Sequence, residues 1–201
     1  MQMLKKVSHR RQVAVGYSQS AYITDYCEIL LNHLTTEAKL GKHVHEFAQF
    51  GYCFEGVFLF DVEDEQFTCS KGKAYDISGN LEHGAVVVED ILALDFKYQQ
   101  NSKKQEKSII KFNAFNQKNV YENEDIKVNS FHDATEDHGI MSYKNYKENY
   151  VLSLKEQNLE VNGQVFQIEK NEIYSIQVET DILNLKLDKQ PKLFLLQLKQ
   201  S

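Results

Sequence analysis

The feature that most limits what this chain can fold into is its rhythm of short apolar segments. Segments rich in Val, Ile, Leu, Phe and Tyr alternate with polar or glycine-containing turns. This pattern is typical of β-strands, and no long amphipathic stretch with a basic face interrupts it. The sequence therefore predicts an all-β protein. The clearest candidate strands are 27–34, 49–54, 57–62, 85–88 and 91–96 in the first half and 150–154, 159–161, 165–168, 173–178, 182–187 and 193–198 in the second.

The chain also repeats itself. At an offset of 99 residues apolar positions align: Phe60 with Leu159, Val62 with Val161, Phe67 with Phe166 and Tyr75 with Tyr174. A repeat of this length indicates a duplicated domain rather than a solenoid, whose periods are shorter. The best candidate linker is the polar segment 99–107, QQNSKKQEK. We therefore predict two domains of similar size, residues 1–98 and 108–201.

Composition excludes several classes of protein. The 23 basic and 29 acidic residues give a formal net charge of −6, which argues against broad attraction to nucleic acid or anionic lipid. No apolar run approaches the roughly 18 residues of a membrane span, and the N-terminus lacks the apolar core of a signal peptide. The three cysteines lack metal-knuckle spacing and are predicted to be reduced thiols. We expect a cytoplasmic protein with a small-molecule ligand and no nucleic-acid or membrane partner.

The residues that indicate chemistry lie in the segment GKHVHEFAQFGYCFEG. His43 and His45 are two positions apart, so on a strand both side chains project from one face, about 7 Å apart along the chain. Gln49 keeps the same parity and can add its amide oxygen to that face. His83, in SGNLEHGAV, would come from a neighbouring antiparallel strand. An isolated HxH pair is more often an exposed or core pair than a metal site, so the evidence lies in the ordered set.

That ordered set resembles the two motifs of the cupin superfamily over residues 25–98. HxHxxxQ with the following Gly56 matches the first motif, and Gly79-x-x-x-His83 matches the second. The resemblance implies two cupin barrels in tandem, each a double-stranded β-helix or jelly roll. It also implies that the first barrel binds one divalent metal ion through His43, His45, Gln49 and His83.

This sequence departs from the fullest cupin pattern at three places. Glu37 stands where a glycine often precedes the HxH pair, Ile77 replaces the usual proline of the second motif, and Val87 replaces its asparagine. These are turn and edge positions. The departures therefore leave the proposed ligands untouched.

The second half lacks the ligand set. At the offset of 99, His43 aligns with Ser142, His45 with Lys144, Gln49 with Glu148 and His83 with Ile182. Its two histidines, His132 and His138, lie in the polar stretch FHDATEDHG, where a loop or solvent role is favoured over a ligand role. We predict a degenerate second barrel without metal. It would pack on the first as two cupin subunits pair, giving a monomer that is an intramolecular pseudo-dimer, or a homodimer.

The ligand set suits Lewis-acid chemistry. Three imidazoles and an amide carry no negative charge, so a divalent ion would keep its full charge and polarise a bound oxygen strongly. These ligands do not choose among iron, manganese, nickel, cobalt and zinc. The first-barrel motif and the strand ILALDFKY resemble the bicupin isomerase of bacilysin biosynthesis and the small cupin that linearises unsaturated uronates. The resemblance implies a metal-dependent isomerase or lyase that acts on a small oxygen-rich acid, either a 2-oxo acid or a uronic acid.

A proton transfer of this kind needs a base beside the metal. Asp95 is the predicted catalytic residue, because strand alternation can bring it to the barrel mouth and the resemblance places an acid there. A solvent-facing aspartate at a strand end is an equal alternative. Glu28, Tyr52 and His33 are weaker candidates. Two other functions stay open, namely an iron-dependent dioxygenase that uses the same ligands and a non-catalytic sensor that binds a small molecule.

Overall fold

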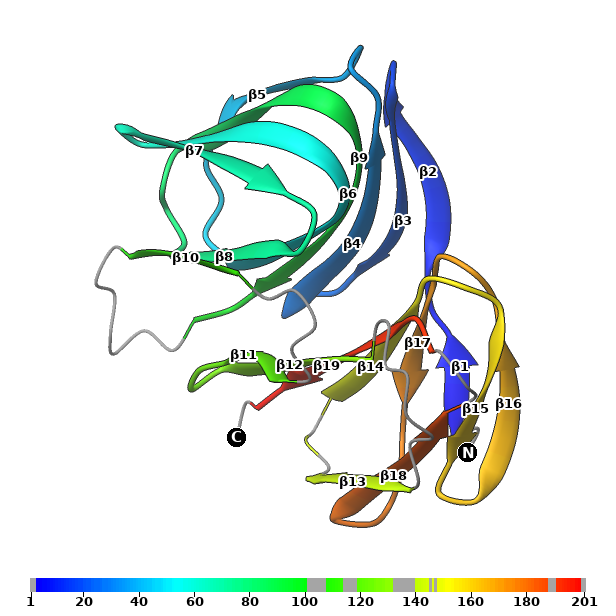
Figure 1. Cartoon of the computed structure of the whole chain (residues 1–201). Helices are drawn as coiled ribbons and strands as arrows, with labels where there is room; N and C mark the ends of the chain where they lie inside the picture. Colours follow the sequence, from blue (N-terminus) through cyan, green and yellow to red (C-terminus); the bar gives the residue numbers. More distant parts are fainter. Residues whose placement is uncertain are drawn as a thin grey trace. The chain divides into compact units, whose positions relative to one another are not determined.

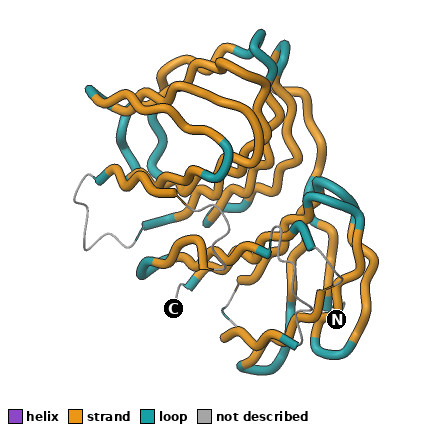
Figure 2. Tube along the Cα trace, viewed as in Figure 1, coloured by secondary structure: helices purple, strands orange, loops and turns teal. Residues whose placement is uncertain are grey.

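A computed structural model describes residues 3–100, 108–113, 119–131, 140–144, 146, 148–187 and 191–199. Every regular element within these residues is a β-strand, so the prediction of an all-β protein is confirmed (Figure 2). The described residues contain no helix long and apolar enough to cross a membrane. The chain forms two compact units, which we call the first unit (His9–Phe115) and the second unit (Met1–Ser8 with Asn116–Ser201).

The first unit is a single curved sheet (Figure 1). Its strand order is β10-β8-β6-β9-β4-β3-β2, with β5 paired to β9 and β7 paired to β6. The two longest strands, β6 and β9, run through the middle of this order and curve around the interior. The strands are β2 (His9–Ala14), β3 (Tyr17–Ile23), β4 (Cys27–Leu34), β5 (Lys39–His43), β6 (Ala48–Val62), β7 (Glu65–Ser70), β8 (Lys73–Ile77), β9 (His83–Tyr98) and β10 (Ile109–Asn113).

The curvature of β6 has a local cause at Gly56. The register between β6 and β9 shifts three times between Cys53 and Phe58, and such bulges bend a strand. Gly56 has a φ of 84°, and a Cβ there would lie 2.0 Å from the carbonyl oxygen of Asp90. Only glycine fits both conditions. The bend lets the first part of β6 pair with β8 and the last part pair with β7.

The second unit contains two sheets, with strand orders β1-β17-β14-β19-β12-β11 and β13-β18-β15-β16. Apolar side chains from both sheets, including Val151, Leu159, Leu185 and Leu195, form one buried core. The strands are β1 (Leu4–Lys6), β11 (Asn119–Glu122), β12 (Ile126–Ser130), β13 (Met141–Lys144), β14 (Glu148–Ser153), β15 (Gln157–Val161), β16 (Gln164–Ile168), β17 (Glu172–Ile176), β18 (Ile182–Leu187) and β19 (Leu193–Leu198).

Strand pairing assigns two short segments differently from the predicted domains 1–98 and 108–201. β1 pairs with β17 of the second unit, and β10 pairs with β8 of the first. β1 therefore belongs to the second unit although it lies at the start of the chain, and β10 belongs to the first unit although it follows the predicted linker. Most of the predicted linker, residues 101–107, lies outside the described residues, as do His132 and His138.

The strand registers show how the two units correspond. Gly51 lies opposite Tyr75 on one side and Asp95 on the other. In the second unit Val151 lies between Tyr174 and Leu195 in the same way. The match extends to the residues two positions earlier, whose side chains lie on the same face of the strand. Gln49 is flanked by Ile77 and Lys97, and Asn149 is flanked by Ile176 and Gln197. The duplication is therefore present in the pairing pattern as well as in the sequence.

These registers correct the positional matches made at an offset of 99. His83 lies between His43 and Val62, and Leu185 lies between Met141 and Val161. The counterparts of His43, Gln49 and His83 are thus Met141, Asn149 and Leu185, instead of Ser142, Glu148 and Ile182. The offset changes along the chain because the two units differ in bulges and turn lengths. Two of the three counterparts are apolar.

Candidate metal centre

Three histidines meet at one end of the first unit. β5 and β9 place His43 directly opposite His83, and His45 follows in the segment between β5 and β6. The ring centroids are 4.4 Å apart for His43 and His83, 4.7 Å for His45 and His83, and 5.7 Å for His43 and His45. One ligand atom from each ring lies within 4.8 Å of the others. Among the described residues, no other group of three His, Cys, Asp or Glu side chains converges in this way.

Each imidazole is oriented by a hydrogen bond from its Nδ1 atom to a backbone carbonyl. His43 bonds to Gly41 at 3.1 Å, His45 to Phe47 at 2.8 Å and His83 to Leu81 at 2.8 Å. Since a carbonyl oxygen can only accept, Nδ1 carries the proton and the lone pair of the neutral ring is on Nε2. This outer hydrogen bond is the arrangement that usually fixes metal-binding histidines. All three rings are thus set to offer Nε2.

Gln49 on β6 completes the group. Its Oε1 lies 3.0 Å from His45 Nε2, and its Nε2 donates to Asp95 Oδ1 at 2.8 Å and to the Tyr75 hydroxyl at 3.2 Å. The carboxylate of Asp95 fixes which end of the amide is which, because only the NH₂ group can face it. The amide oxygen therefore points to the histidines.

This arrangement leaves acceptors facing acceptors. The lone pair of His45 Nε2 faces the oxygen of Gln49, and His83 Nε2 is buried with no hydrogen-bond partner in the described structure. Buried acceptors without a donor are costly, by about 1–3 kcal/mol each. A cation at this point would satisfy them together. The residues therefore fit a divalent metal ion.

Burial favours, in His45 and His83, the neutral form that a metal ligand needs. Desolvation lowers the pKa of His45, and the nearby positive charge of Lys97 lowers it further. Desolvation also lowers the pKa of His83, to about 4, and the other two histidines add to this shift. His43 is the exposed member of the three and marks the open side of the site.

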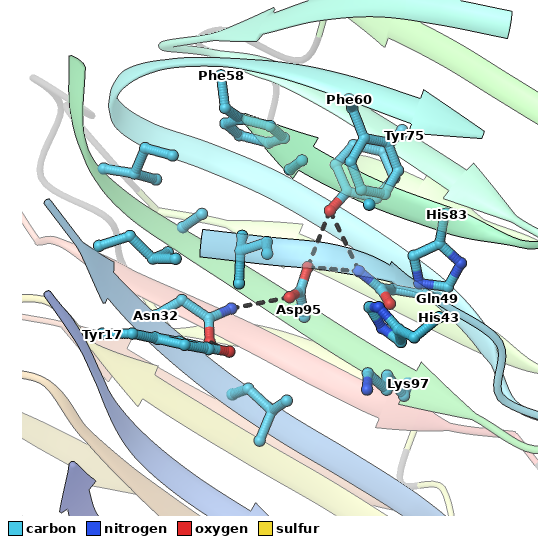
Figure 3. A pocket seen from close by; sticks show the side chains of 17 residues that line it. Tyr17, Asn32, His43, Gln49, Phe58, Phe60, Tyr75, His83, Asp95 and Lys97 are labelled. Carbon is cyan, nitrogen blue, oxygen red and sulfur yellow. Dashed lines mark hydrogen bonds between the residues drawn. The ribbon is translucent and has the colours of Figure 1, made fainter. Parts of the chain in front are cut away.

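Asp95 lies beside this group on β9 (Figure 3). Its Oδ1 accepts from Gln49 and from the Tyr75 hydroxyl at 2.9 Å, and its Oδ2 accepts from Asn32 Nδ2 at 2.8 Å. Burial raises the pKa of the Asp95 carboxyl, while Lys97 and the three hydrogen bonds oppose that rise. The predicted acid therefore faces the pocket and is linked to the candidate ligands through Gln49.

Gly51 is what admits Tyr75 to the interior. A Cβ at Gly51 would lie 2.1 Å from the Tyr75 ring. In the second unit this position is Val151, and the Tyr174 hydroxyl accepts instead from the backbone NH of Glu169 at 2.8 Å. The hydrogen-bond group around Asp95 thus depends on a residue without a side chain.

The histidines open onto a pocket of about 600 Å³, part of which is open solvent (Figure 3). Its polar lining includes His43, Gln49, His83, Asp95 and Lys97, and also Tyr17 and Asn32, which the sequence analysis did not single out. No motif marks these last two, because they enter from β3 and β4 at ordinary strand positions. Lys97 could have been found by parity, since it lies two positions from Asp95 on the same face of β9.

The weaker candidates occupy other places. Glu28 pairs with Lys97, with 3.2 Å between Oε2 and Nζ, and is absent from the pocket lining. Tyr52 is buried against Phe54 at a ring distance of 4.9 Å, and His33 also lies away from the pocket. The three cysteines are free and buried.

The fold was compared with known proteins. No protein-family model and no curated protein sequence matches this chain. Solved structures do match over nearly its whole length. The bacterial pirin YhhW from Escherichia coli, solved in complex with nickel(II), superposes with a TM-score of 0.78 at 11% identity, covering 98% of this chain and 99% of that one. These neighbours are cupin-fold proteins.

The chain has the cupin fold. Other cupins show the same likeness. AerE from Microcystis aeruginosa gives a TM-score of 0.74 at 15% identity over 97% of this chain and 98% of that one. Quercetin 2,3-dioxygenase from Acinetobacter baumannii gives 0.66 at 10% identity over 96% and 78%. The prediction of tandem cupin barrels is confirmed, and identities this low establish the fold alone.

Proposed function

We propose that this cupin is a metal-dependent enzyme. One divalent ion would be held in the first unit by the Nε2 atoms of His43, His45 and His83 and by Oε1 of Gln49. The observation that supports this most strongly is the convergence of unprotonated acceptors, with the Gln49 oxygen facing His45 and His83 Nε2 buried without a partner. Neutral imidazole and amide ligands bind iron, manganese, nickel, cobalt and zinc, so they do not identify the metal.

The reaction we propose is an isomerase or lyase step on a small oxygen-rich acid. A bound divalent ion would supply Lewis acidity to a substrate oxygen. Asp95 would act as the base. A carboxylate has about four acceptor positions, so the three hydrogen bonds from Gln49, Tyr75 and Asn32 leave one for a substrate proton. Burial raises the pKa of Asp95, which makes it a stronger base than an exposed aspartate.

An iron-dependent dioxygenase is the second candidate. The same histidines would serve it, and quercetin 2,3-dioxygenase from Acinetobacter baumannii shares the fold. The two candidates differ in their need for dioxygen. An isomerase or lyase reacts without it, whereas a dioxygenase consumes it with substrate.

We propose further that the protein works in the cytoplasm on a small molecule, as a monomer or a homodimer. The support is the net charge of −6, which disfavours nucleic acid and anionic membranes as partners. The pocket beside the histidines is open to solvent on one side and combines apolar walls with a few polar groups, as small-molecule sites do.

Proton exchange tests the proposed reaction. Protein loaded with manganese, iron or cobalt is incubated with 2-oxo acids in deuterated buffer, and deuterium at the carbon next to the oxo group is followed by NMR. We expect metal-dependent exchange that Asp95→Asn lowers about 100-fold, the usual size of a general-base contribution. Oxygen uptake is recorded in parallel with catechol-like substrates. Oxygen uptake without proton exchange would replace the isomerase or lyase proposal by the dioxygenase.

A further inference from the structure

A row of polar side chains crosses the sheet of the first unit from the edge strand β2 to the pocket. Arg11 on β2 lies directly opposite Gln19 on β3, and Gln19 lies directly opposite Asn32 on β4. Arg11 is exposed, whereas Gln19 and Asn32 are only 4% and 3% exposed. Asn32 lines the pocket, but Arg11 and Gln19 are absent from its lining. Any influence of these two residues on the pocket therefore passes through Asn32.

The hydrogen bonds that link this row all run in the same direction. Arg11 Nε donates to Gln19 Oε1 at 2.8 Å, and Gln19 Nε2 donates to Asn32 Oδ1 at 2.7 Å. Asn32 Nδ2 in turn donates to Asp95 Oδ2 at 2.8 Å (Figure 3). The two ends fix this direction, because a guanidinium nitrogen can only donate and a carboxylate oxygen can only accept. Neither amide can turn over unless one of the ends changes.

The same direction continues beyond Asp95 to the candidate metal ligands. Asp95 Oδ1 accepts from Gln49 Nε2 at 2.8 Å, and this bond turns the Gln49 oxygen toward His45. The row thus connects an exposed guanidinium to the metal site through four strands besides its own, namely β3, β4, β9 and β6. A change of direction at the exposed end is therefore felt at the metal ligand.

The second unit has apolar residues at the places of Asn32 and Asp95. Leu195 occupies the position of Asp95. Asn32 lies opposite the residue two places before Asp95, and Phe131 donates its backbone NH to the carbonyl two places before Leu195. Phe131 is thus the counterpart of Asn32, and both it and Leu195 belong to the buried core. Since apolar pairs can replace buried hydrogen-bonded pairs at little cost in stability, folding alone does not require the polar row. The row accompanies the histidines.

We propose that Arg11 and Gln19 are positioning residues of the metal centre and act on Asp95 through Asn32. They fix the direction of the Asn32 amide, so that Asp95 meets a donor on each of its oxygens and stays aligned with Gln49. The inference rests on the proposed function for its metal ion, whereas the direction of the row is tested without metal.

Reversing the row is the first test. In Gln19→Glu the new carboxylate accepts from Arg11 and from a turned Asn32, so the Asn32 oxygen faces Asp95, acceptor against acceptor. We expect the melting temperature of the first unit in the metal-free full chain to fall by about 5–10 °C. The affinity for cobalt(II) is expected to fall about tenfold, because Gln49 loses the alignment of Asp95. Scanning calorimetry and competition with a chromophoric chelator measure these two quantities.

The double variant of Gln19→Glu with Asp95→Asn is the decisive sample. It moves the carboxylate from one side of Asn32 to the other. The amide introduced at position 95 can donate to the turned Asn32 while its oxygen still accepts from Gln49. Gln19→Glu is therefore expected to raise the melting temperature of Asp95→Asn by at least about 5 °C, although it lowers that of the wild type. Independent sites would instead add their losses.

Arg11→Met releases the row without reversing it, and it serves if Gln19→Glu does not fold. The Gln19 amide can then turn over, so Arg11→Met is expected to raise the melting temperature of Asp95→Asn by about 3–5 °C. Arg10→Met is the matched control. It removes the same charge from the neighbouring position of β2, whose side chain faces the other side of the sheet, and it is expected to act equally on both backgrounds.

Two results would overturn the inference. One is a further fall in melting temperature when Gln19→Glu is added to Asp95→Asn, and the other is an unchanged cobalt affinity in folded Gln19→Glu. A wild-type chain that takes up no cobalt would instead overturn the proposed metal function, and with it the role of the row at a metal centre. The melting temperatures of the metal-free samples would still decide the direction of the row.

Discussion

Replacing Asp95 by asparagine tests the hydrogen bonds that orient Gln49. The new side chain keeps the shape but has one acceptor and one donor end. If its oxygen faces Gln49 and Tyr75, its NH₂ group faces the NH₂ group of Asn32. Asn32 resists turning over, because its oxygen already accepts from Tyr17 and Gln19. If the new NH₂ group faces Gln49 instead, Gln49 turns its amide and withdraws Oε1 from the histidines.

The size of the effect follows from these contacts. The variant leaves one buried donor without a partner, at about 1–3 kcal/mol, and makes the bonds from Gln49 and Tyr75 neutral, at about 1 kcal/mol each. Relief from burying a charged carboxylate offsets part of this loss. We expect the free energy of unfolding of the metal-free first unit to fall by about 2 kcal/mol, which is about 10 °C in melting temperature for a unit of this size.

Scanning calorimetry of the metal-free protein measures the stability, and competition with a chromophoric chelator measures the metal affinity. We expect the metal affinity of Asp95→Asn to fall about tenfold, equivalent to about 1.4 kcal/mol, since one of four ligands loses its orientation. Tyr75→Phe is the comparison variant, because it removes the Tyr75 hydroxyl's bonds with Asp95 and with Gln49 but leaves the shorter Gln49 to Asp95 bond, which orients the amide, in place. Metal affinity unchanged in Asp95→Asn would refute the orientation argument.

Three further predictions concern other residues. Gly51→Val should displace Tyr75 and cost about 1–3 kcal/mol in urea unfolding, and wild-type stability would contradict this. His83→Leu, which introduces the type of residue found at Leu185, should abolish metal uptake. Element analysis of the purified variant checks this, and stoichiometric metal in folded His83→Leu would contradict it. Leu4→Ala should cost about 2–3 kcal/mol and speed hydrogen exchange in the second unit only, because β1 pairs there. Faster exchange confined to the first unit would contradict that assignment.

The candidate ligands were accessible from the sequence because they form an ordered motif. Gln49 is an even number of residues from His43 and His45, so strand alternation predicts that its side chain faces the same side as theirs. The match of Gly79-x-x-x-His83 to the second motif predicts that His83 joins them. His45, however, follows β5 instead of lying on a strand, so strand alternation does not explain its position. The carbonyls that orient the rings, such as those of Phe47 and Leu81, belong to turns whose geometry no motif encodes.

The fold was predictable as a class but less so in its boundaries. Hydrophobic rhythm predicts strands, yet it does not say which sheet edge a terminal strand will complete, so the places of β1 and β10 were missed. The repeat was detectable at a fixed offset. The bulges around Gly56 and unequal turns change the offset along the chain, so a fixed value misaligned Gln49 with Glu148 instead of Asn149.

The metal content of protein purified without a metal-affinity tag tests the central claim most directly. Element analysis is made on the wild type, on His45→Ala and on His9→Ala, a matched control because His9 lies on the exposed strand β2 of the same unit. We predict close to one divalent ion per chain in the wild type and in His9→Ala, and none in His45→Ala. Stoichiometric metal retained in folded His45→Ala would contradict the assignment of the site.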